Sequence, residues 1–263
     1  NLSTGKKEAI PTKAKLIVGD ILNQKLLEKI LPGHDAIFHF AALIEAGISF
    51  VDPATFFKVN VNGSFSLAEA ARITGVKKII FSSTAAVYRP KNTPLTEEDL
   101  KEPENPYGAT KLAFENLLAA YHYSYGIESV TLRYFNAYGP WERQVGETHV
   151  IPNFIKAVLA SKPVPLYWHG AQVRDFIYID DLVKAHILAL KIKGYNYYNL
   201  GTGKGTKISD LLKLVFKICG KSAPIEDLGK REGDPQVLVA SYDKAKKELG
   251  WVPTVSLEEG LAK

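Results

Sequence analysis

Tyr107 and Lys111 have the residue types and the spacing of a proton-transfer site. The apolar pattern around them predicts a helix over Pro106–Tyr125, with proline at its start and Gly126 directly after its end. Residues four apart in a helix lie on the same face. A lysine ammonium beside a phenol favours the phenolate and lowers the pKa of the phenol, which makes Tyr107 a candidate general base near neutral pH. The same spacing is common in solvated surface helices, so the pair needs support from its surroundings.

Hydroxyl-bearing and small residues end two apolar segments upstream of this pair. Ser82, Ser83 and Thr84 follow one strand-like run, and HFAAL at 39–43 ends another. The carboxyl ends of parallel strands face the crevice where ligands bind, so both segments are candidate ligand contacts. A turn that caps a strand would explain the same hydroxyls. Further polar segments lie at 60–63 (NVNG) and 133–140 (RYFNAYGP).

Strand-like runs alternate with helical spacing in the first half of the chain, which predicts right-handed βαβ units and a parallel sheet. We expect strands at 15–19, 36–41, 78–82 and 129–134, and helices at 24–31, 61–74 and Pro106–Tyr125. In the second half we expect strands at 164–168, 176–179 and 197–200, and helices at 151–160, 180–192, 209–219 and 243–249. Ser209 is the expected cap of the helix at 209–219.

The composition excludes several broad classes of protein. The chain has 263 residues, 46% hydrophobic and 23% charged, which is close to the globular average and allows a large core. Its apolar runs are too short to cross a bilayer, so we expect no membrane partner. The net charge of +5 comes without blocks of like charge, so nucleic acid is not an expected partner. The single cysteine, Cys219, excludes an intrachain disulfide and a cysteine-based zinc cluster, and no metal is expected.

Eight motifs occur in the order and spacing of the extended short-chain dehydrogenase/reductases: DI at 20–21, HFAAL, NVNG, FSSTAAVY, YGATK, LRYFNAYGP, VRDFIYIDD and REGD. Within this family the chain most resembles the NAD-dependent UDP-galactose 4-epimerases, over essentially its whole length. The resemblance implies an α/β fold, a Rossmann-like doubly wound parallel sheet with a smaller C-terminal substrate-binding part. It places the NAD-binding domain at residues 1–136 and 176–200, and the nucleotide-sugar domain at residues 137–175 and 201–263.

The resemblance implies NAD as cofactor and assigns side chains to it. The expected cofactor-binding residues are Asn1, Asp20, Ile21, Phe40, Ala41, Ala42, Asn60, Ser82, Tyr107, Lys111 and Tyr134. Asp20 and Ile21 are expected at the adenine, and Asn60 and Ser82 near the nicotinamide half. Lys111 is expected to hold the nicotinamide ribose while it tunes Tyr107.

The resemblance also implies a UDP-sugar substrate and epimerisation through a 4-keto sugar. The expected catalytic residues are Tyr107, Lys111 and Thr84, with Tyr107 taking the proton of the sugar 4-OH. The expected substrate-binding residues are Thr84, Asn136, Tyr167, Arg174, Arg231 and Asp234. Among them Tyr167 packs on the uracil, and the two arginines clamp the diphosphate, whose oxygens suit forked donors.

The sequence departs from the family pattern at several places. The glycine-rich phosphate loop and the first strand of the family are missing before Asn1, so we expect a chain truncated at its N-terminus. The chain also stops at Lys263, before the family's final helix is complete. Leu238 stands where some members carry a bulky aromatic, which predicts a sugar pocket that also accepts N-acetylated hexoses. Arg89 stands where the family usually has glycine.

Other functions stay open on the sequence alone. A UDP-glucuronate decarboxylase is compatible with RYFNAYGP, whereas a 4,6-dehydratase usually has an Asp-Glu pair where this chain has Ala85 and Ala86. A non-catalytic nucleotide-sugar-binding relative is the third possibility, and the joint presence of Thr84, Tyr107 and Lys111 argues against it.

The family pattern also predicts how the chain associates and where it works. We expect a homodimer through the helices at Pro106–Tyr125 and 61–74. The apolar positions that exceed the needs of one helix face are Leu112, Phe114, Leu117, Leu118 and Tyr121. The absence of a disulfide framework suits a reducing compartment, and we expect a cytoplasmic protein.

Overall fold

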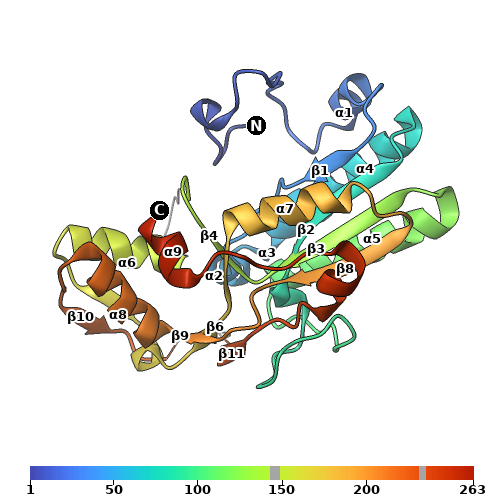
Figure 1. Ribbon diagram of the computed structural model, residues 1–263. Coiled ribbons are helices and arrows are strands. Elements are labelled where there is room, and N and C mark those ends of the chain that lie inside the picture. Colours follow the sequence, from blue (N-terminus) through green and yellow to red (C-terminus); the bar gives the residue numbers. More distant parts are fainter. Residues whose placement is uncertain (143–148, 231–234) are drawn as a thin grey trace. The chain divides into compact units, whose positions relative to one another are not determined.

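The computed structural model describes residues 1–142, 149–230 and 235–263, as Figure 1 shows. By packing, the chain divides into two compact units. The first unit comprises Asn1–Ser83, Asn105–Thr131 and Lys193–Asn196. The second unit comprises Thr84–Glu104, Leu132–Ile192 and Tyr197–Lys263.

Among the described helices, α5 is the longest, with 20 residues. The α-helices are α1 (Gln24–Ile30), α2 (Ala46–Val51), α3 (Pro53–Phe56), α4 (Gly63–Thr74), α5 (Pro106–Tyr125), α6 (Val150–Leu159), α7 (Ile179–Ala189), α8 (Ile208–Cys219) and α9 (Leu257–Ala262). Short 3-10 turns are η1 (Lys7–Ala9), η3 (Ala85–Val87) and η4 (Trp168–Gly170), and π-helical turns are η2 (Phe57–Asn62) and η5 (Ala245–Leu249). In the part of the chain described here, no helix is both long and apolar enough to cross a membrane.

In the described residues, the strands form one larger sheet and three small ones. They are β1 (Ile37–His39), β2 (Lys78–Thr84), β3 (Glu128–Tyr134), β4 (Asn136–Tyr138), β5 (Val164–Leu166), β6 (Val173–Arg174), β7 (Phe176–Tyr178), β8 (Tyr195–Leu200), β9 (Thr206–Lys207), β10 (Ile225–Asp227) and β11 (Val237–Leu238). The larger sheet has the order β1-β2-β3-β8, and β1 runs parallel to β2 with Ile37 opposite Ile79. The small sheets have the orders β10-β5, β11-β6-β9 and β4-β7. The α/β class and the parallel sheet expected from the sequence are confirmed.

The core of the first unit lies between β2 and the helices that cover it. β2 is buried along its apolar run, as expected for a strand covered on both faces. Phe81 of β2, Leu67 of α4 and Phe114 of α5 belong to one cluster of buried side chains. In Figure 1, α1 and α4 lie side by side, and Leu27 of α1 joins the same cluster.

The second unit has its own core. α6 and α8 pack against each other, and α6 also packs against β5, which pairs with β10. Figure 1 shows β10 beside the two helices. Phe154 of α6 and Leu211 of α8 are buried together with Val164 of β5 and Tyr178 of β7. The N-terminus of α7 is held by Asp181, whose carboxylate accepts hydrogen bonds from the N–H groups of Thr254 and Val255 (2.8 and 2.9 Å).

Two local expectations are wrong. Residues 15–20 form no strand, because β-branched residues make a strand only where a neighbour accepts their hydrogen bonds, and no described strand pairs with this stretch. Ser209 does not cap α8, because Lys207 takes the cap position as the end of β9 and Ile208 donates its N–H to the Gln172 carbonyl (2.9 Å). The helix expected at 61–74 instead begins as the π-helical turn η2 and continues as α4.

Candidate functional site

The N-terminus of α5 places Tyr107 in a fixed setting in the first unit. Asn105 caps the helix by accepting a hydrogen bond from the Gly108 N–H (2.8 Å), and Pro106 occupies the first turn. The Tyr107 N–H donates to the Ser49 hydroxyl of α2 (3.1 Å), and its ring meets the Phe56 ring of α3 edge-on, with centroids 6.5 Å apart. Helices α2 and α3, which the sequence analysis did not predict, therefore support the candidate base.

Lys111 lies one turn further along α5 and is buried, with 3% of its surface exposed. Its ammonium donates to the Ser82 carbonyl at the carboxyl end of β2 (2.8 Å) and lies 4.8 Å from the centroid of the Phe81 ring. Burial lowers the pKa of Lys111 to about 7, although the Glu115 carboxylate acts in the opposite direction. The lysine is thus poised to hold or release a proton near neutral pH.

Buried polar groups surround the end of β2. The Ser82 hydroxyl donates to the His39 carbonyl (3.1 Å), and the Ser83 hydroxyl donates to the Glu115 carboxylate. His39 is buried between aromatic rings, and burial, helped by the charge of Lys111, lowers its pKa to about 3. Glu115 was missed by the sequence analysis, and its position four residues after Lys111 on the same helix face is the signal that identifies it.

Asn60 links the loop after β1 to α5. Its side-chain carbonyl accepts the Leu43 N–H (2.8 Å), and its amide donates to the Leu43 carbonyl (2.9 Å) and to the Thr110 hydroxyl (3.0 Å). The residue is 2% exposed and lies in the π-helical turn η2, a distortion that is frequent at functional sites. Asn60 therefore fixes the position of the loop at 41–43 relative to α5.

A cavity of about 380 Å³ opens in the first unit and brings six of the predicted cofactor residues together. The six are Asn1, Asp20, Ile21, Phe40, Ala41 and Ala42. Much of the remaining wall is apolar, with Leu26, Ile37 and Leu67 among its side chains. A concave wall that combines apolar side chains with polar groups is suited to a small-molecule ligand.

Asp20 supplies the acidic group of this cavity. Its carboxylate accepts hydrogen bonds from the Leu22 N–H (2.9 Å) and the Asn1 side-chain amide (2.8 Å). These two bonds lower the pKa of Asp20, so the group is ionised at neutral pH. An ionised carboxylate beside an apolar wall fits the amino and hydroxyl groups of a nucleoside.

The second unit holds Thr84 and the predicted substrate contacts. The Thr84 hydroxyl oxygen accepts the Ala86 N–H (3.2 Å) and so caps η3. A hydroxyl that accepts one hydrogen bond still has its own hydrogen to donate. Turn capping and substrate contact are therefore compatible roles for this residue.

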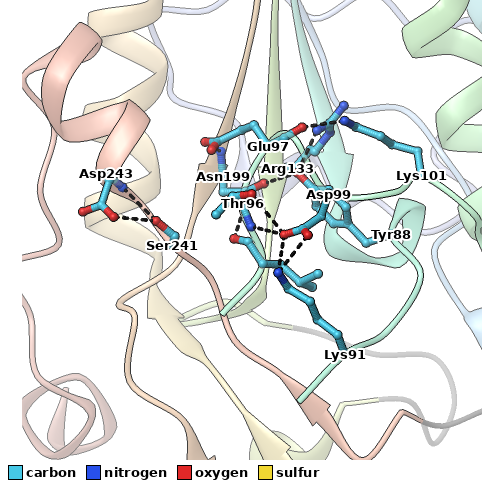
Figure 2. Close-up of polar contacts among 11 residues, drawn as sticks. Tyr88, Lys91, Thr96, Glu97, Asp99, Lys101, Arg133, Asn199, Ser241 and Asp243 are labelled. Atoms are coloured by element: carbon cyan, nitrogen blue, oxygen red, sulfur yellow. Dashed lines mark hydrogen bonds and ion pairs between the residues drawn. The ribbon is translucent and has the colours of Figure 1, made fainter. Parts of the chain in front are cut away.

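A polar network fixes the segment that follows Thr84, as Figure 2 shows. Arg133 of β3 donates to the Tyr88 hydroxyl (2.7 Å), and that hydroxyl donates to the Asn199 side chain of β8 (2.7 Å). The Asn199 N–H donates to the Glu97 carboxylate (2.7 Å), and burial raises the pKa of Glu97. The same segment is joined to residues 239–241, because the Leu95 N–H donates to the Val239 carbonyl (2.8 Å).

Tyr134 is oriented by α7. The Nδ1–H group of His186 donates a hydrogen bond to the Leu182 carbonyl (2.7 Å). In a neutral ring the Nε2 atom then carries no hydrogen, so it accepts a hydrogen bond from the Tyr134 hydroxyl (2.5 Å). Burial lowers the pKa of His186, which keeps the ring neutral and this arrangement intact at neutral pH.

Three positions singled out for the substrate are joined through the small sheets of the second unit. Arg174 on β6 lies opposite Leu238 on β11, and the Asn136 N–H donates to the Asp175 carbonyl (2.9 Å). Arg174 is 7% exposed and donates to the Val173 carbonyl (2.9 Å). The side-chain oxygen of Asn136 is buried, and no described residue donates a hydrogen bond to it.

Of the other predicted substrate residues, Tyr167 lies in the same unit. Tyr167 is half-buried and precedes η4, where His169 has a positive φ of 49°. Gly170 follows with a φ of 72°, and a Cβ there would lie 2.7 Å from the Ser209 nitrogen, so this turn requires glycine. Arg231 and Asp234 lie outside the described residues. Among the described residues, no group of acidic, histidine or cysteine side chains could hold a metal ion.

The comparisons with known proteins agree with this geometry. The sequence profile of the NAD dependent epimerase/dehydratase family matches residues 1–201. A UDP-glucose 4-epimerase of Rhizobium leguminosarum bv. trifolii is 41% identical over 261 residues, which is 92% of this chain and 80% of that protein. The UDP-glucose 4-epimerase of Thermotoga maritima, solved with UDP-glucose, superposes with a TM-score of 0.94 at 37% identity, over 99% of this chain and 86% of that chain. The UDP-glucose 4-epimerase of Thermus thermophilus, solved with NAD, gives a TM-score of 0.93 at 35% identity, over 99% of this chain and 86% of that chain.

Proposed function

This chain belongs to the NAD dependent epimerase/dehydratase family, and we propose that it is a nucleotide-sugar 4-epimerase that interconverts UDP-glucose and UDP-galactose with bound NAD. The observation that carries the proposal is the buried Lys111 one helical turn after Tyr107, with its ammonium bonded to the Ser82 carbonyl near the carboxyl end of β2. The isomerase activity and the Rossmann-like fold follow from the family and from relatives at this level of identity.

NAD fits the residues of the first unit. The ionised Asp20 and the apolar wall of the cavity suit the adenosine half, and the small side chains of Ala41 and Ala42 allow close approach of phosphates to the backbone. Asn60 and Ser82 of this unit are proposed near the nicotinamide half, and Tyr134, a residue of the second unit, is a further proposed cofactor contact. NAD bound there would supply reversible hydride transfer at C4 of the sugar, which is the redox part of the epimerisation.

The protein's own part of the reaction is proton transfer and positioning. Tyr107 takes the proton of the sugar 4-OH and later returns it to the same oxygen. The positive charge of Lys111 favours the phenolate of Tyr107, and an anion near Lys111 raises the pKa of the lysine and keeps it charged. Thr84 donates its hydroxyl hydrogen to the sugar oxygen and so orients it. The Phe56 ring packs against the ring of Tyr107, and the Phe81 ring lies against the ammonium of Lys111.

The second unit is proposed to bind the UDP part of the substrate. Arg174 and Arg231 hold the diphosphate, Tyr167 packs on the uracil, and Asp234 binds the ribose hydroxyls. Asn136 supports this proposal, because its buried side-chain oxygen needs a donor and a sugar hydroxyl can provide one. We propose that the chain is divided by the ligand that each part binds. Residues 1–136 and 176–200 form the cofactor domain, and residues 137–175 and 201–263 form the substrate domain.

Three finer features of the function are also proposed. The chain works as a homodimer in the cytoplasm, in keeping with the family pattern and with the single cysteine in the sequence. The pocket accepts N-acetylated hexoses, because Leu238 is shorter than the aromatic of narrower relatives. In parallel assays, UDP-galactose and UDP-N-acetylgalactosamine should then differ in kcat/KM by less than about 100-fold, which corresponds to about 2.7 kcal/mol at the transition state.

The activity is tested in two incubations, each of which contains the protein and NAD. One receives UDP-galactose and the other UDP-glucuronate, and the products are followed by NMR. We expect UDP-glucose from the first and no loss of carbon dioxide from the second. Decarboxylation of UDP-glucuronate without conversion of UDP-galactose would contradict the epimerase proposal and show that the protein is a UDP-glucuronate decarboxylase.

A further inference from the structure

Asp175 is a buried carboxylate that the proposed mechanism does not use. It follows Arg174 at the end of β6, and its side chain has no exposed surface. One carboxylate oxygen accepts the N–H and the hydroxyl of Thr202 (2.8 and 2.6 Å). The other accepts the N–H groups of Gly203 and Ala240 (2.9 and 3.1 Å). Asp175 thus joins three segments that are far apart in the sequence.

The backbone of the same residue makes two more connections. Its N–H donates to the Leu238 carbonyl (3.1 Å), and its carbonyl accepts the Asn136 N–H (2.9 Å). Asn136, Arg174 and Leu238 are therefore all bonded to Asp175 or adjacent to it in the chain. These are three of the positions that the proposed function assigns to the diphosphate and the sugar.

Gly201 shows how tightly the carboxylate is enclosed. A Cβ at this position would lie 2.6 Å from the Asp175 carboxylate oxygen and 2.6 Å from the Ala240 Cβ. Such contacts do not occur in real structures, so a side chain here would displace the carboxylate or the backbone of residue 240. The loop at 201–203 is shaped to bring N–H groups to Asp175.

We infer that Asp175 is a positioning residue for the nucleotide-sugar site, which holds Arg174, Asn136 and Leu238 in register through its carboxylate and backbone. The inference rests on the proposed function for the identity of the ligand, a uridine diphosphate. A carboxylate is suited to the task because it only accepts hydrogen bonds, and all its partners here donate. The substitution Asp175→Asn would turn an amide group toward N–H donors and lose part of this register.

The second unit offers a matched control in Asp181. It is equally buried and accepts the Thr254 N–H and hydroxyl (2.8 and 2.7 Å) and the Val255 N–H (2.9 Å). These bonds join α7 to residues 254–255, and none of them involves a residue assigned to the substrate. Asp181 also accepts a hydrogen bond from the Lys184 ammonium (3.0 Å). Asp181→Asn therefore removes a comparable set of backbone and hydroxyl bonds, together with this ion pair, without the connection to Arg174.

The experiment compares Asp175→Asn with Asp181→Asn in the same protein. The affinity for UDP is measured by calorimetry. KM and kcat for UDP-galactose are measured by steady-state assays of the NAD-loaded enzyme. Stability is measured as the midpoint of unfolding in denaturant. We expect Asp175→Asn to weaken UDP binding and to raise KM by about 10-fold, which is the effect of weakening one charge-assisted hydrogen bond from a displaced Arg174 to the diphosphate, with kcat changed far less. Asp181→Asn should keep the UDP affinity and the KM within about twofold of the wild-type values, while it loses about as much stability as Asp175→Asn. Equal effects of the two variants on UDP affinity would overturn the inference.

A second pair of variants covers the case in which Asp175→Asn does not fold. Thr202→Val removes one hydroxyl donor to Asp175, whereas Thr202→Ser keeps it. The inference requires weaker UDP binding in the valine variant and recovery in the serine variant, and equal binding in both would overturn it. Failure of the proposed function is distinguishable, because it would appear as wild-type protein that does not convert UDP-galactose, whereas the UDP affinities of the variants still test Asp175.

Discussion

Tyr107 takes its proposed reactivity from side chains on several elements of the first unit. α2 binds its backbone through Ser49, α3 packs Phe56 against its ring, and α5 places Lys111 one turn away. Lys111 is in turn held by the Ser82 carbonyl in an apolar setting that brings its pKa to about 7. Removing the phenolic oxygen should therefore abolish proton transfer while leaving this packing intact.

We expect Tyr107→Phe to lower kcat for UDP-galactose by about 100-fold or more, the usual contribution of a general base. The control is Tyr121→Phe on the same helix, where the lost hydroxyl contacts Glu69 and no predicted site residue. Steady-state assays on both variants check this, with unfolding curves to confirm that each is folded. A Tyr107→Phe enzyme with more than about a tenth of the wild-type kcat would contradict the base role.

His39 makes the stability of the first unit dependent on pH. Its pKa in the folded protein is about 3, below the usual 6.5, because burial disfavours the charged ring. The unfolded chain therefore binds one more proton than the folded chain between pH 3 and 6.5, and stability present above pH 6.5 is lost as the pH falls through this window. In the middle of this pH window, His39 should lower the free energy of unfolding by about 1.4 kcal/mol for each pH unit of acidification.

Urea unfolding of the wild type and of His39→Gln at several pH values between 4 and 7 measures this contribution. The glutamine variant should be less stable at pH 7 and should lose less of its remaining stability on acidification. Parallel pH profiles for wild type and His39→Gln would show that His39 is not the titrating group.

At the scale of elements, the cap of α5 connects helix stability with catalysis. The Asn105 side chain accepts the Gly108 N–H and fixes the turn that carries Tyr107. We expect Asn105→Ala to cost about 1 kcal/mol of unfolding free energy. It should also lower kcat by about 10-fold, because small displacements of a catalytic group are costly. Asn105→Asp keeps the acceptor and should restore both properties.

Ser256→Ala is the matched control for this cap. Ser256 caps α9 with a capping box, and α9 carries no residue assigned to catalysis or binding. This variant should lose similar stability and keep its kcat. Equal losses of kcat in Ser256→Ala and Asn105→Ala would mean that the effect reports general destabilisation and not the position of Tyr107.

The elements also show what sequence patterns can predict. α5 was predicted with its bounds, because proline, helical spacing and a final glycine all act locally, and Gly126 indeed adopts a left-handed φ of 70°. The strand at 15–19 and the Ser209 cap were wrong, because strand pairing depends on partners elsewhere in the chain. Asp175 lies inside the recognised motif VRDFIYIDD, yet its role emerges only when Thr202, Gly203 and Ala240 are brought to it by the fold.

At the scale of the whole molecule, the predicted dimer needs a surface that one chain leaves uncovered. Phe114, Leu118 and Tyr121, which the sequence analysis counted toward that surface, are buried in the core of the first unit itself. The support therefore shifts to exposed side chains of α4 and to the end of α5, with Phe65 46% and Tyr125 56% exposed.

We expect a dimer by light scattering at about 10 μM, with Phe65→Glu shifting it toward monomer because a charge is costly in an apolar interface. The control is Val51→Glu on α2, which places the same charge on an exposed residue of another helix and should leave the dimer intact. A wild-type monomer at this concentration would contradict the predicted dimer.

The central claim, a 4-epimerase that works through a 4-keto sugar, is tested most directly by following the hydrogen on C4. UDP-galactose deuterated at C4 is incubated in ordinary water with the protein and NAD, and the UDP-glucose formed is analysed by NMR and mass spectrometry. In the proposed reaction this hydrogen never exchanges with water, so the product should carry deuterium at C4. Product with ordinary hydrogen at C4, or no UDP-glucose from protein that still binds UDP, would contradict the account.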